Sequence, residues 1–292
     1  MITSRPYGTS GLQLSGLGLG AGQLGDARLS ENEASDLLSA SLDAGVSLID
    51  TAPSYGLSEQ RIGRHLATRR NEAVISTKLG YGVEGIPDWT GPCIVAGVDQ
   101  ALRILRTDYI DIAHLHSCPW TVLAQGDVLD ALERAKQSGK VRAIAYSGEN
   151  EDLDYAVGMD RFDGFMGSLN LFDQRVIDRI LPRITDKGFI AKRPSANHPW
   201  RFDAQPVGDY CEPYWQRWQA MGLDSDGMAW GELAIRFALS IPGVSSAIVG
   251  TGRAAHLLQN RDWIAKGPLG PPLVSRWRKC FAERDEGWSG QL

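Results

Sequence analysis

The sequence predicts an α/β fold, a closed (β/α)8 TIM barrel formed by the whole chain of 292 residues. Short apolar runs recur along the chain, and each later run is followed by apolar residues at the 3.6-residue period of a helix. Eight such runs, with no break in composition, indicate parallel strands joined by right-handed helical crossovers. A doubly wound open sheet is the alternative. At this length we favour the closed barrel and expect residues 1–292 to form one domain.

The first elements are an N-terminal β-hairpin and a buried strand. Residues 5–7 and 12–14 flank Gly-Thr-Ser-Gly, which predicts the hairpin. Residues 17–20 form the first barrel strand. The spacing of Gly16, Gly18 and Ala21 is similar to a dinucleotide-binding fingerprint, but the next helix starts only near Ser30. The fingerprint requires glycines that open the helix directly, so we reject that interpretation.

The remaining strands follow in order, and most of them end in a polar residue. They are predicted at residues 48–50, 73–78, 109–116, 142–147, 165–170, 188–192 and 247–249. Ser30 and Glu33 form a capping box at the start of the first helix. The long segment 193–227 after strand seven is rich in Trp and Tyr, which linkers avoid, so we interpret it as a long loop inserted in the barrel. A further helix is predicted around residues 274–281.

Composition and charge restrict the class of protein. The chain is 43% hydrophobic and 22% charged with a net charge of -5, which is typical of a soluble protein that binds neither nucleic acid nor anionic membranes. No apolar run reaches the ~20 residues of a membrane span, and the first ten residues lack a secretory signal. The four cysteines are scattered without metal-binding spacing. We therefore expect a cytoplasmic protein without a metal, either a monomer or a weak homo-oligomer.

Four polar residues of different types lie where strands two, three and four end. Asp50, Lys78 and His116 end these strands, and Tyr55 lies in the loop after strand two. In a barrel these ends converge on the C-terminal face, where active sites of this fold are found. One such residue alone is more often structural. All four in this arrangement are hard to explain by packing, so we predict a catalytic site.

The chemistry of this group follows from its ionisation. A tyrosine has a pKa near ~10 and is a weak acid at neutral pH. The Lys78 ammonium favours the phenolate, and Asp50 keeps that lysine charged. Tyr55 could then donate a proton to a carbonyl oxygen that His116 also hydrogen-bonds. Such a carbonyl carbon must receive a hydride, and the sequence has no metal or flavin motif, so nicotinamide is the expected source.

Five segments carry a resemblance to a known family. They are DTAPSYGLSEQRIG (50–63), STK (76–78), DYIDIAHLH (108–116), KVRAIAYS (140–147) and IVGTGRAAHLLQN (248–260). In this order they resemble the aldo-keto reductase family over nearly the whole chain. The resemblance implies that Asp50, Tyr55, Lys78 and His116 form the family's catalytic tetrad. It also implies reduction of aldehydes and ketones, or the reverse reaction, with NADP(H) or less often NAD(H).

The residues expected near the nicotinamide depart from the family pattern. Ser147 keeps its expected role, but Gly148 follows it where asparagine is usual, and Met166 stands where glutamine is expected. Lys192 or Arg193 takes the place of an aromatic residue that often stacks on the ring, and an arginine could stack there instead. Asn170 is a candidate for the missing carboxamide contact, and Gly20 at the end of the first strand is a further cofactor-binding candidate.

The phosphate end of the cofactor is assigned to the last βα unit. Gly250 and Thr251 precede a helix whose N-terminus attracts phosphate. The resemblance adds Arg253, His256, Gln259 and Asn260 as adenosine-phosphate residues. Because Arg253 could bind a 2′-phosphate, we predict NADP, with NAD as the alternative.

Aromatic residues on the same rim suggest the substrate. Trp89 and Trp120 closely follow the strands that end in Lys78 and His116, so we expect them to line the pocket. Trp215 and Trp218 could equally pin a helix on the barrel. No compact basic cluster accompanies these aromatics, which favours a neutral aldehyde, ketone or sugar lactol. Two alternatives stay open: an NAD-linked sugar dehydrogenase, and a nicotinamide-binding sensor or partner subunit with little turnover, which the altered nicotinamide contacts would favour.

Overall fold

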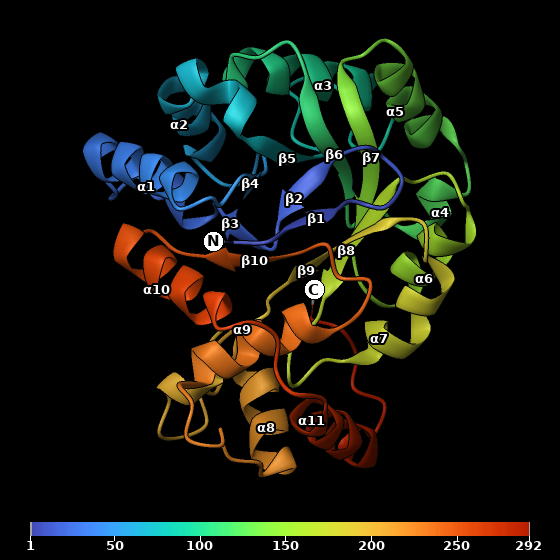
Figure 1. Ribbon diagram of the computed structural model, residues 1–292. Helices are drawn as coiled ribbons and strands as arrows, with labels where there is room; N and C mark the ends of the chain where they lie inside the picture. The colour runs from blue at the N-terminus through green and yellow to red at the C-terminus, as the bar shows by residue number, and fades with distance from the viewer. Residues whose placement is uncertain (1, 292) are drawn as a thin grey trace.

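Eight parallel strands close into a barrel in the computed structural model, which describes residues 2–291 (Figure 1). Each strand pairs with the next along the chain, and the last pairs with the first. The predicted fold class is confirmed. The barrel strands are β3 (Leu17–Gly20), β4 (Leu48–Asp50), β5 (Val74–Leu79), β6 (Ile110–His116), β7 (Val141–Ser147), β8 (Gly164–Ser168), β9 (Gly188–Lys192) and β10 (Ser246–Gly250).

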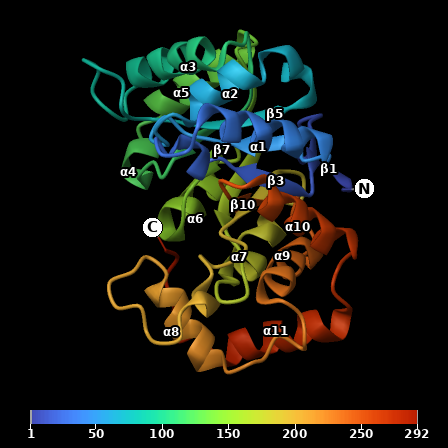
Figure 2. The same cartoon turned by 90° about the vertical axis from the view of Figure 1, so that its left-hand side faces the viewer.

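Helices surround the barrel and connect its strands (Figures 1 and 2). The capping box at Ser30 and Glu33 forms as predicted, with each residue's side chain bonded to the other's backbone N–H. The α-helices are α1 (Glu31–Asp43), α2 (Ser58–His65), α3 (Gly91–Leu105), α4 (Trp120–Leu123), α5 (Asp127–Gln137), α6 (Asn150–Gly158), α7 (Arg175–Arg179), α8 (Glu212–Met221), α9 (Trp230–Ser240), α10 (Ala254–Ala265) and α11 (Pro271–Arg284).

The N-terminal hairpin closes one end of the barrel. Its strands β1 (Ser4–Pro6) and β2 (Gln13–Ser15) pair antiparallel, one residue from the predicted positions. Tyr7 at its turn is fully buried, and its ring fills space that a Cβ at Gly164 or Gly188 would occupy. The hairpin therefore plugs the barrel with apolar side chains, and the opposite end stays free for polar ones.

The sixth strand of the barrel, β8, is shorter than predicted. It ends at Ser168, and the chain then leaves the sheet, because the Asn170 N–H bonds the Asp173 carbonyl and the Asn170 side chain accepts from the Phe172 N–H. This local turn removes Asn170 from the barrel strand. The predicted helix after it is also short, five residues of α7 followed by a 3-10 turn at Leu181–Arg183.

The inserted segment after β9 contains helix α8, which lies beside α11 below the barrel (Figures 1 and 2). Tryptophans join these elements: Trp230 of α9 stacks on Trp200 with ring centroids 5.8 Å apart and meets Trp218 of α8 edge-on at 5.4 Å. Trp230 also contacts the fully buried Trp277 of α11. Trp218 thus fastens α8 to its neighbouring helices.

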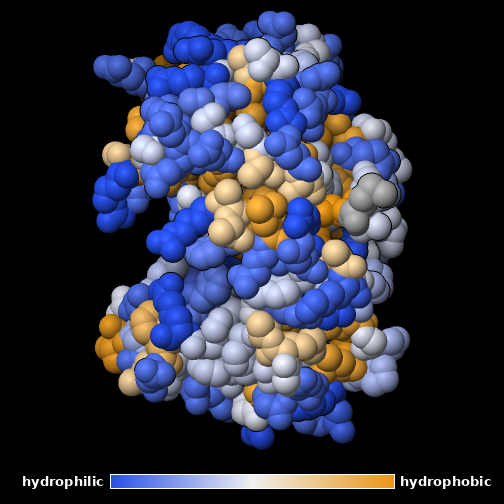
Figure 3. Space-filling view, turned by 60° about the vertical axis from the view of Figure 1, so that its left-hand side comes forward, coloured by the Kyte–Doolittle hydropathy of each residue, from blue (hydrophilic) through white to orange (hydrophobic). Residues whose placement is uncertain are grey.

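The outer surface is mostly hydrophilic on the face shown in Figure 3, which has a deep hollow at one edge. Hydrophobic side chains fill the space between barrel and helices, and a second cluster fills the barrel interior. Among residues 2–291, no helix has the length and apolar character needed to span a bilayer.

Candidate active site

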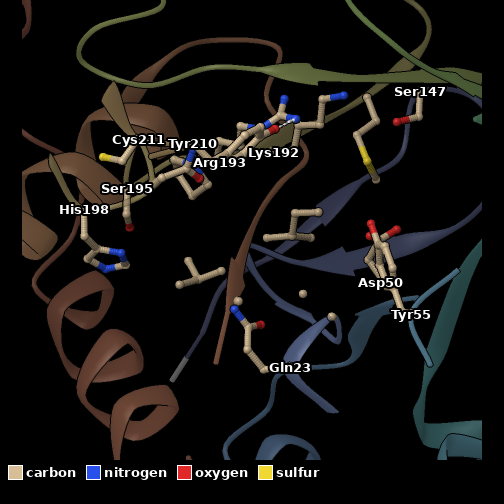
Figure 4. Close-up of a pocket in the computed structure, with 18 of the residues that line it drawn as sticks. Gln23, Asp50, Tyr55, Ser147, Lys192, Arg193, Ser195, His198, Tyr210 and Cys211 are labelled. Atoms are coloured by element: carbon tan, nitrogen blue, oxygen red, sulfur yellow. Dashed lines mark hydrogen bonds between the residues drawn. The ribbon is translucent and has the colours of Figure 1, made fainter. Parts of the chain in front are cut away.

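A cavity of about 410 Å³ opens at the carboxyl ends of the barrel strands (Figure 4). Asp50, Tyr55, Lys78 and His116 all line it, so the structure brings the four predicted catalytic residues together. Met166 also lines the cavity and belongs to the packed barrel interior. The cavity therefore has an apolar base and a polar wall.

Asp50 and Lys78 form a buried ion pair. The Lys78 ammonium lies 2.7 Å from Asp50 Oδ2, and each side chain is only 2% exposed. Lys78 Nζ also donates to the Thr51 carbonyl at 2.8 Å, and Ser76 Oγ donates to Asp50 Oδ1 at 2.8 Å. Strands β4 and β5 pair with Asp50 beside Ser76, which places these groups side by side. Such multiple bonds are what a buried ion pair needs to offset desolvation.

Tyr55 lies next to this pair, with the Lys78 ammonium 5.3 Å from its ring centroid. Lys78 exerts the largest single effect and lowers the Tyr55 pKa, but burial and the Asp50 charge outweigh it, so the net pKa is raised. Burial lowers the pKa of Lys78, but the charges of Asp50 and Tyr55 outweigh it and the net pKa is raised. At neutral pH, Tyr55 is thus a protonated phenol beside a charged lysine.

His116 is a neutral imidazole. Burial, followed by the positive charges of Lys78, Lys192 and Arg193, lowers its pKa to about 3. Its Nδ1 is hydrogen-bonded to the Tyr81 hydroxyl. Because Nδ1 is engaged outside the cavity lining, Nε2 is the ring nitrogen available to a molecule in the cavity.

His114 is a second histidine of β6 that the sequence reasoning missed. It is fully buried, and its Nε2 lies 3.0 Å from Ser76 Oγ, which in turn donates to Asp50. Burial lowers the pKa of His114 well below its usual value, so it is neutral. Because Ser76 uses its proton on Asp50, His114 Nε2 must be the donor to Ser76. His114 and His116 are two residues apart on one strand, so their side chains point to the same face. This spacing could have indicated that His114 lies near the tetrad.

Lys192 and Arg193 meet a shared carboxylate on the opposite wall. Glu149 Oε1 lies 3.3 Å from Lys192 Nζ and 3.2 Å from Arg193 Nη1, and Glu149 is 2% exposed. Ser168 supports the same oxygen through its N–H at 2.9 Å and its hydroxyl at 2.6 Å. Arg193 also donates to Ser168 Oγ and to the Tyr210 hydroxyl. Two cations are therefore held rigidly at the cavity by one buried anion.

Replacing Glu149 with glutamine is expected to loosen this wall. Arg193 would keep its charge in a buried place without a counter-ion, which costs on the order of 3 kcal/mol in the free energy of unfolding. Burial lowers the pKa of Lys192, and the loss of the Glu149 charge, which raises it, would lower that pKa further. We expect urea denaturation to show that loss, and fluorescence titration to show weaker nicotinamide dinucleotide binding. Glu151→Gln, an exposed substitution on α6, is the matched control. Equal stability of both variants would show that Glu149 does not hold the cations.

The cavity residues fit a nicotinamide dinucleotide. The hydroxyls of Ser147 and Ser195 are buried, lie in the cavity lining, and have no hydrogen-bond partner within residues 2–291. Figure 4 shows Ser147 on the same side of the cavity as Asp50 and Tyr55, and Ser195 on the other side near His198. Buried hydroxyls without partners are costly in a folded protein, so these two are suited to bind a polar ligand.

The structure gives a cause for the departure at Gly148 and shows where Asn170 lies. A Cβ at Gly148 would lie 2.5 Å from the buried Tyr146 ring, so no larger residue fits there unless Tyr146 moves. Asn170 lies outside the cavity lining, and its amide nitrogen donates to the Arg193 carbonyl at 3.1 Å. The Asn170 side chain therefore supports the backbone at Arg193. It does not lie where it could contact a carboxamide in the cavity.

The expected phosphate end is formed by β10 and α10. Gly20 and Gly250 line the cavity, and their strands approach so closely that a Cβ at Gly20 would lie 3.3 Å from Gly250 N. Thr251 Oγ1 accepts from the Arg253 N–H at 3.0 Å, just before the first turn of α10. Arg253, His256 and Gln259 are exposed, and Asn260 is buried. These residues lie beyond the cavity lining, on the segment that continues from Gly250 into α10.

The structure places neither Trp89 nor Trp120 in the lining of this cavity. Trp89 packs against Tyr81 with centroids 6.0 Å apart, and Trp120 is 45% exposed and packs on Tyr155. The lining comes from the inserted segment instead. It includes Asn197, His198, Arg201, Asp209, Tyr210 and Cys211, which the sequence reasoning did not assign.

Comparisons with known proteins agree with this geometry. The family model described as "Aldo/keto reductase family" matches residues 16–281. The chain is 27% identical to L-galactose dehydrogenase of Arabidopsis thaliana over 282 residues, covering 89% of this chain and 87% of the relative. It is 29% identical to D-threo-aldose 1-dehydrogenase of a Pseudomonas species, covering 88% and 91%.

A solved structure shares the whole architecture. The holo form of an aldo-keto reductase from Bacillus halodurans superposes with a TM-score of 0.82 at 25% identity and covers 96% of both chains. Since the family model spans most of this sequence and the tetrad is assembled in one cavity, the chain belongs to the aldo/keto reductase family.

Proposed function

We propose that this protein is an NADP(H)-dependent oxidoreductase that reduces an aldehyde or ketone to an alcohol, or runs the reverse reaction. The observation that supports it best is the buried Asp50–Lys78 pair next to Tyr55, in a cavity that a neutral His116 also lines. Membership of the aldo/keto reductase family makes the protein an oxidoreductase. The cofactor preference and the role of Tyr55 are our proposals.

Tyr55 acts as the general acid in this proposal. It is protonated at neutral pH and can donate its proton to the carbonyl oxygen as negative charge develops there. The Lys78 ammonium then stabilises the phenolate that remains, and Asp50 holds that ammonium in place. His116 orients the carbonyl oxygen through Nε2. In the oxidation direction the phenolate accepts the proton from the alcohol.

A bound nicotinamide supplies or accepts the hydride. Ser147 would hold its carboxamide, since that hydroxyl is buried without another partner. Arg193, fixed by Glu149 and Ser168, would lie against the ring. Gly20 and Gly250, which have no side chains, would leave room for the phosphates, and Thr251 would lie beside them before α10. The three catalytic side chains Tyr55, Lys78 and His116 and the nicotinamide then share one cavity.

Steady-state turnover tests this function. Purified protein is mixed with NADPH or NADH and a panel of aromatic, aliphatic and sugar carbonyls, and absorbance of the reduced cofactor is followed. We expect substrate-dependent loss of NADPH. Binding of NADPH without turnover by any carbonyl would instead favour a nicotinamide-binding sensor.

Arg253→Ala is expected to weaken NADPH binding more than NADH binding. Only NADPH carries the 2′-phosphate that an exposed guanidinium at the start of α10 could bind in a bidentate manner. We expect roughly a tenfold larger loss for NADPH, the scale of one charge-assisted contact. Fluorescence titration of both cofactors measures it.

Arg261→Ala is the control for that prediction. Arg261 lies on the same helix but pairs with Asp262 at 2.6 Å. Its removal should change both affinities little. Equal losses of NADPH and NADH affinity in Arg253→Ala would assign the phosphate contact to another residue.

A sugar dehydrogenase is the second candidate. The two curated relatives are named as dehydrogenases of L-galactose and of D-threo-aldoses. The cavity lining is also rich in polar side chains from the inserted segment, including Asn197, His198 and Asp209, which suit a polyhydroxylated substrate. Faster oxidation of aldoses by NAD⁺ than reduction of simple aldehydes by NADPH would select this candidate.

A further inference from the structure

Tyr81 lies behind His116 of the tetrad and does not itself line the cavity. It follows Lys78 by three residues, and its hydroxyl is hydrogen-bonded to His116 Nδ1 and lies 3.1 Å from Ser54 Oγ. The two rings lie nearly side by side, with centroids 5.5 Å apart and planes inclined by 31°. One contact comes from the end of β6 and the other from the loop after β4. The hydroxyl is therefore the group through which the loop after β5 acts on His116.

The surrounding loop fixes Tyr81 in this place. The Trp89 N–H donates to the Gly80 carbonyl at 2.7 Å, and the Trp89 indole covers the side of Gly80 where a Cβ would be. Gly80 has φ = +129°, a conformation that only glycine adopts readily. Trp89 then meets the Tyr81 ring edge-on, at 6.0 Å and 62°. Trp89 thus orients Tyr81. Through Tyr81, Trp89 is linked to the catalytic residue His116.

A neutral imidazole has one donor nitrogen and one acceptor nitrogen, and its partners decide which is which. A phenol is a much stronger acid than a neutral imidazole N–H, so the favoured bond runs from the Tyr81 O–H to a bare Nδ1. The Ser54 hydroxyl can complete the arrangement by donating to the Tyr81 oxygen. The proton of His116 is then left on Nε2, the nitrogen available to the cavity. The opposite tautomer would present a lone pair to the substrate oxygen and repel it.

We propose that Tyr81 is a positioning residue that selects the Nε2–H tautomer of His116, so that His116 donates a hydrogen bond to the substrate oxygen. This inference rests on the proposed function for its kinetic consequence, but the tautomer itself can be measured without any cofactor. The low pKa of His116, about 3, agrees with it, because the ring stays neutral and a tautomer choice exists at every working pH.

Nitrogen-15 NMR of the histidine rings tests the proposal directly. The chain has five histidines, and the spectrum of His116→Gln assigns the ring of His116 by the signals that it lacks. In the wild type we expect a protonated Nε2 and a bare Nδ1 between pH 6 and 8. In Tyr81→Phe, which keeps the ring that packs on Trp89, we expect a mixture of both tautomers. A protonated Nδ1 in the wild type, or an unchanged spectrum in Tyr81→Phe, would overturn the proposal.

A double-mutant cycle gives the kinetic test. Tyr81→Phe is expected to lower kcat/KM about tenfold in the wild-type background, the scale of one oriented hydrogen bond. In the His116→Gln background the same change should have less than about a twofold effect, because the ring that Tyr81 orients is gone. Tyr155→Phe, which removes an exposed phenol on α6, is the matched control. Equal losses in both backgrounds would contradict a role through His116.

The failure of the proposed function is distinguishable from the failure of this inference. Should both Tyr55→Phe and His116→Gln retain full turnover, the proposed catalytic mechanism is wrong, whatever the tautomer. Should these variants lose activity while Tyr81→Phe keeps the activity and the ring spectrum of the wild type, only the role of Tyr81 is wrong.

Discussion

Replacing Tyr55 with phenylalanine is expected to lower the rate of carbonyl reduction by at least ~100-fold, the usual scale for loss of a positioned general acid. The ring would remain near Lys78, so only the hydroxyl group and its proton are lost. Neither Lys78, which is bonded to Asp50 and Thr51, nor the neutral His116 is free to supply that proton at neutral pH. Single-turnover reduction at saturating cofactor and substrate measures the effect.

The affinity for NADPH serves as the internal control of that experiment. The phenol oxygen is not among the groups that we assign to the cofactor, so titration of NADPH fluorescence should give nearly the wild-type dissociation constant. A Tyr55→Phe variant that turns over at nearly the wild-type rate would assign the acid to another group.

Lys78→Met is expected to reduce turnover strongly and to change its pH dependence. Lys78 is the largest single influence on Tyr55 and lowers its pKa, so its removal raises a pKa that is already above the ordinary value. Reduction needs the phenol, and its alkaline limb should move to higher pH. Oxidation needs the phenolate, so the pH of its half-maximal rate should rise by about one to three units.

Two further variants make this result interpretable. Lys78→Met leaves Asp50 buried without its cation, and Asp50→Asn combined with Lys78→Met removes both charges. The double variant should fold more stably than the single one and show a smaller shift, because the raising effect of Asp50 is also lost. Lys279→Met on α11 is the surface control. An identical pH profile in the wild type and in Lys78→Met would show that Lys78 does not influence the pKa of Tyr55.

The alternation of apolar runs and helical periods was sufficient to predict the barrel, because each strand is buried on both faces and each helix on one. It also predicted which strand ends meet, so that Asp50, Lys78 and His116 could be placed on one rim before their distances were known. Boundaries were less certain where a side chain redirected the backbone, as Asn170 does after β8.

The supporting residues were harder to predict, since they depend on contacts across loops. Ser76 precedes Lys78 by two residues on β5, so strand alternation could have indicated Ser76. Glu149 lies beyond the end of β7, where that alternation no longer applies. Nothing local indicated that Glu149 would meet Lys192 and Arg193 from the far side of β8. The tryptophans were assigned to the pocket from their distance along the chain, but Trp89 folds back over Gly80.

The most direct test of the proposed function is the transfer of deuterium from NADPH labelled at the reactive carbon of the nicotinamide. The protein is incubated with the labelled cofactor and the best carbonyl of the panel, and the alcohol is examined by mass spectrometry and NMR. We predict one deuterium on the former carbonyl carbon in the wild type, and at least ~100-fold slower labelling with Tyr55→Phe. Oxidised cofactor without a labelled alcohol, or equal labelling rates in the two proteins, would contradict hydride transfer with Tyr55 as the acid.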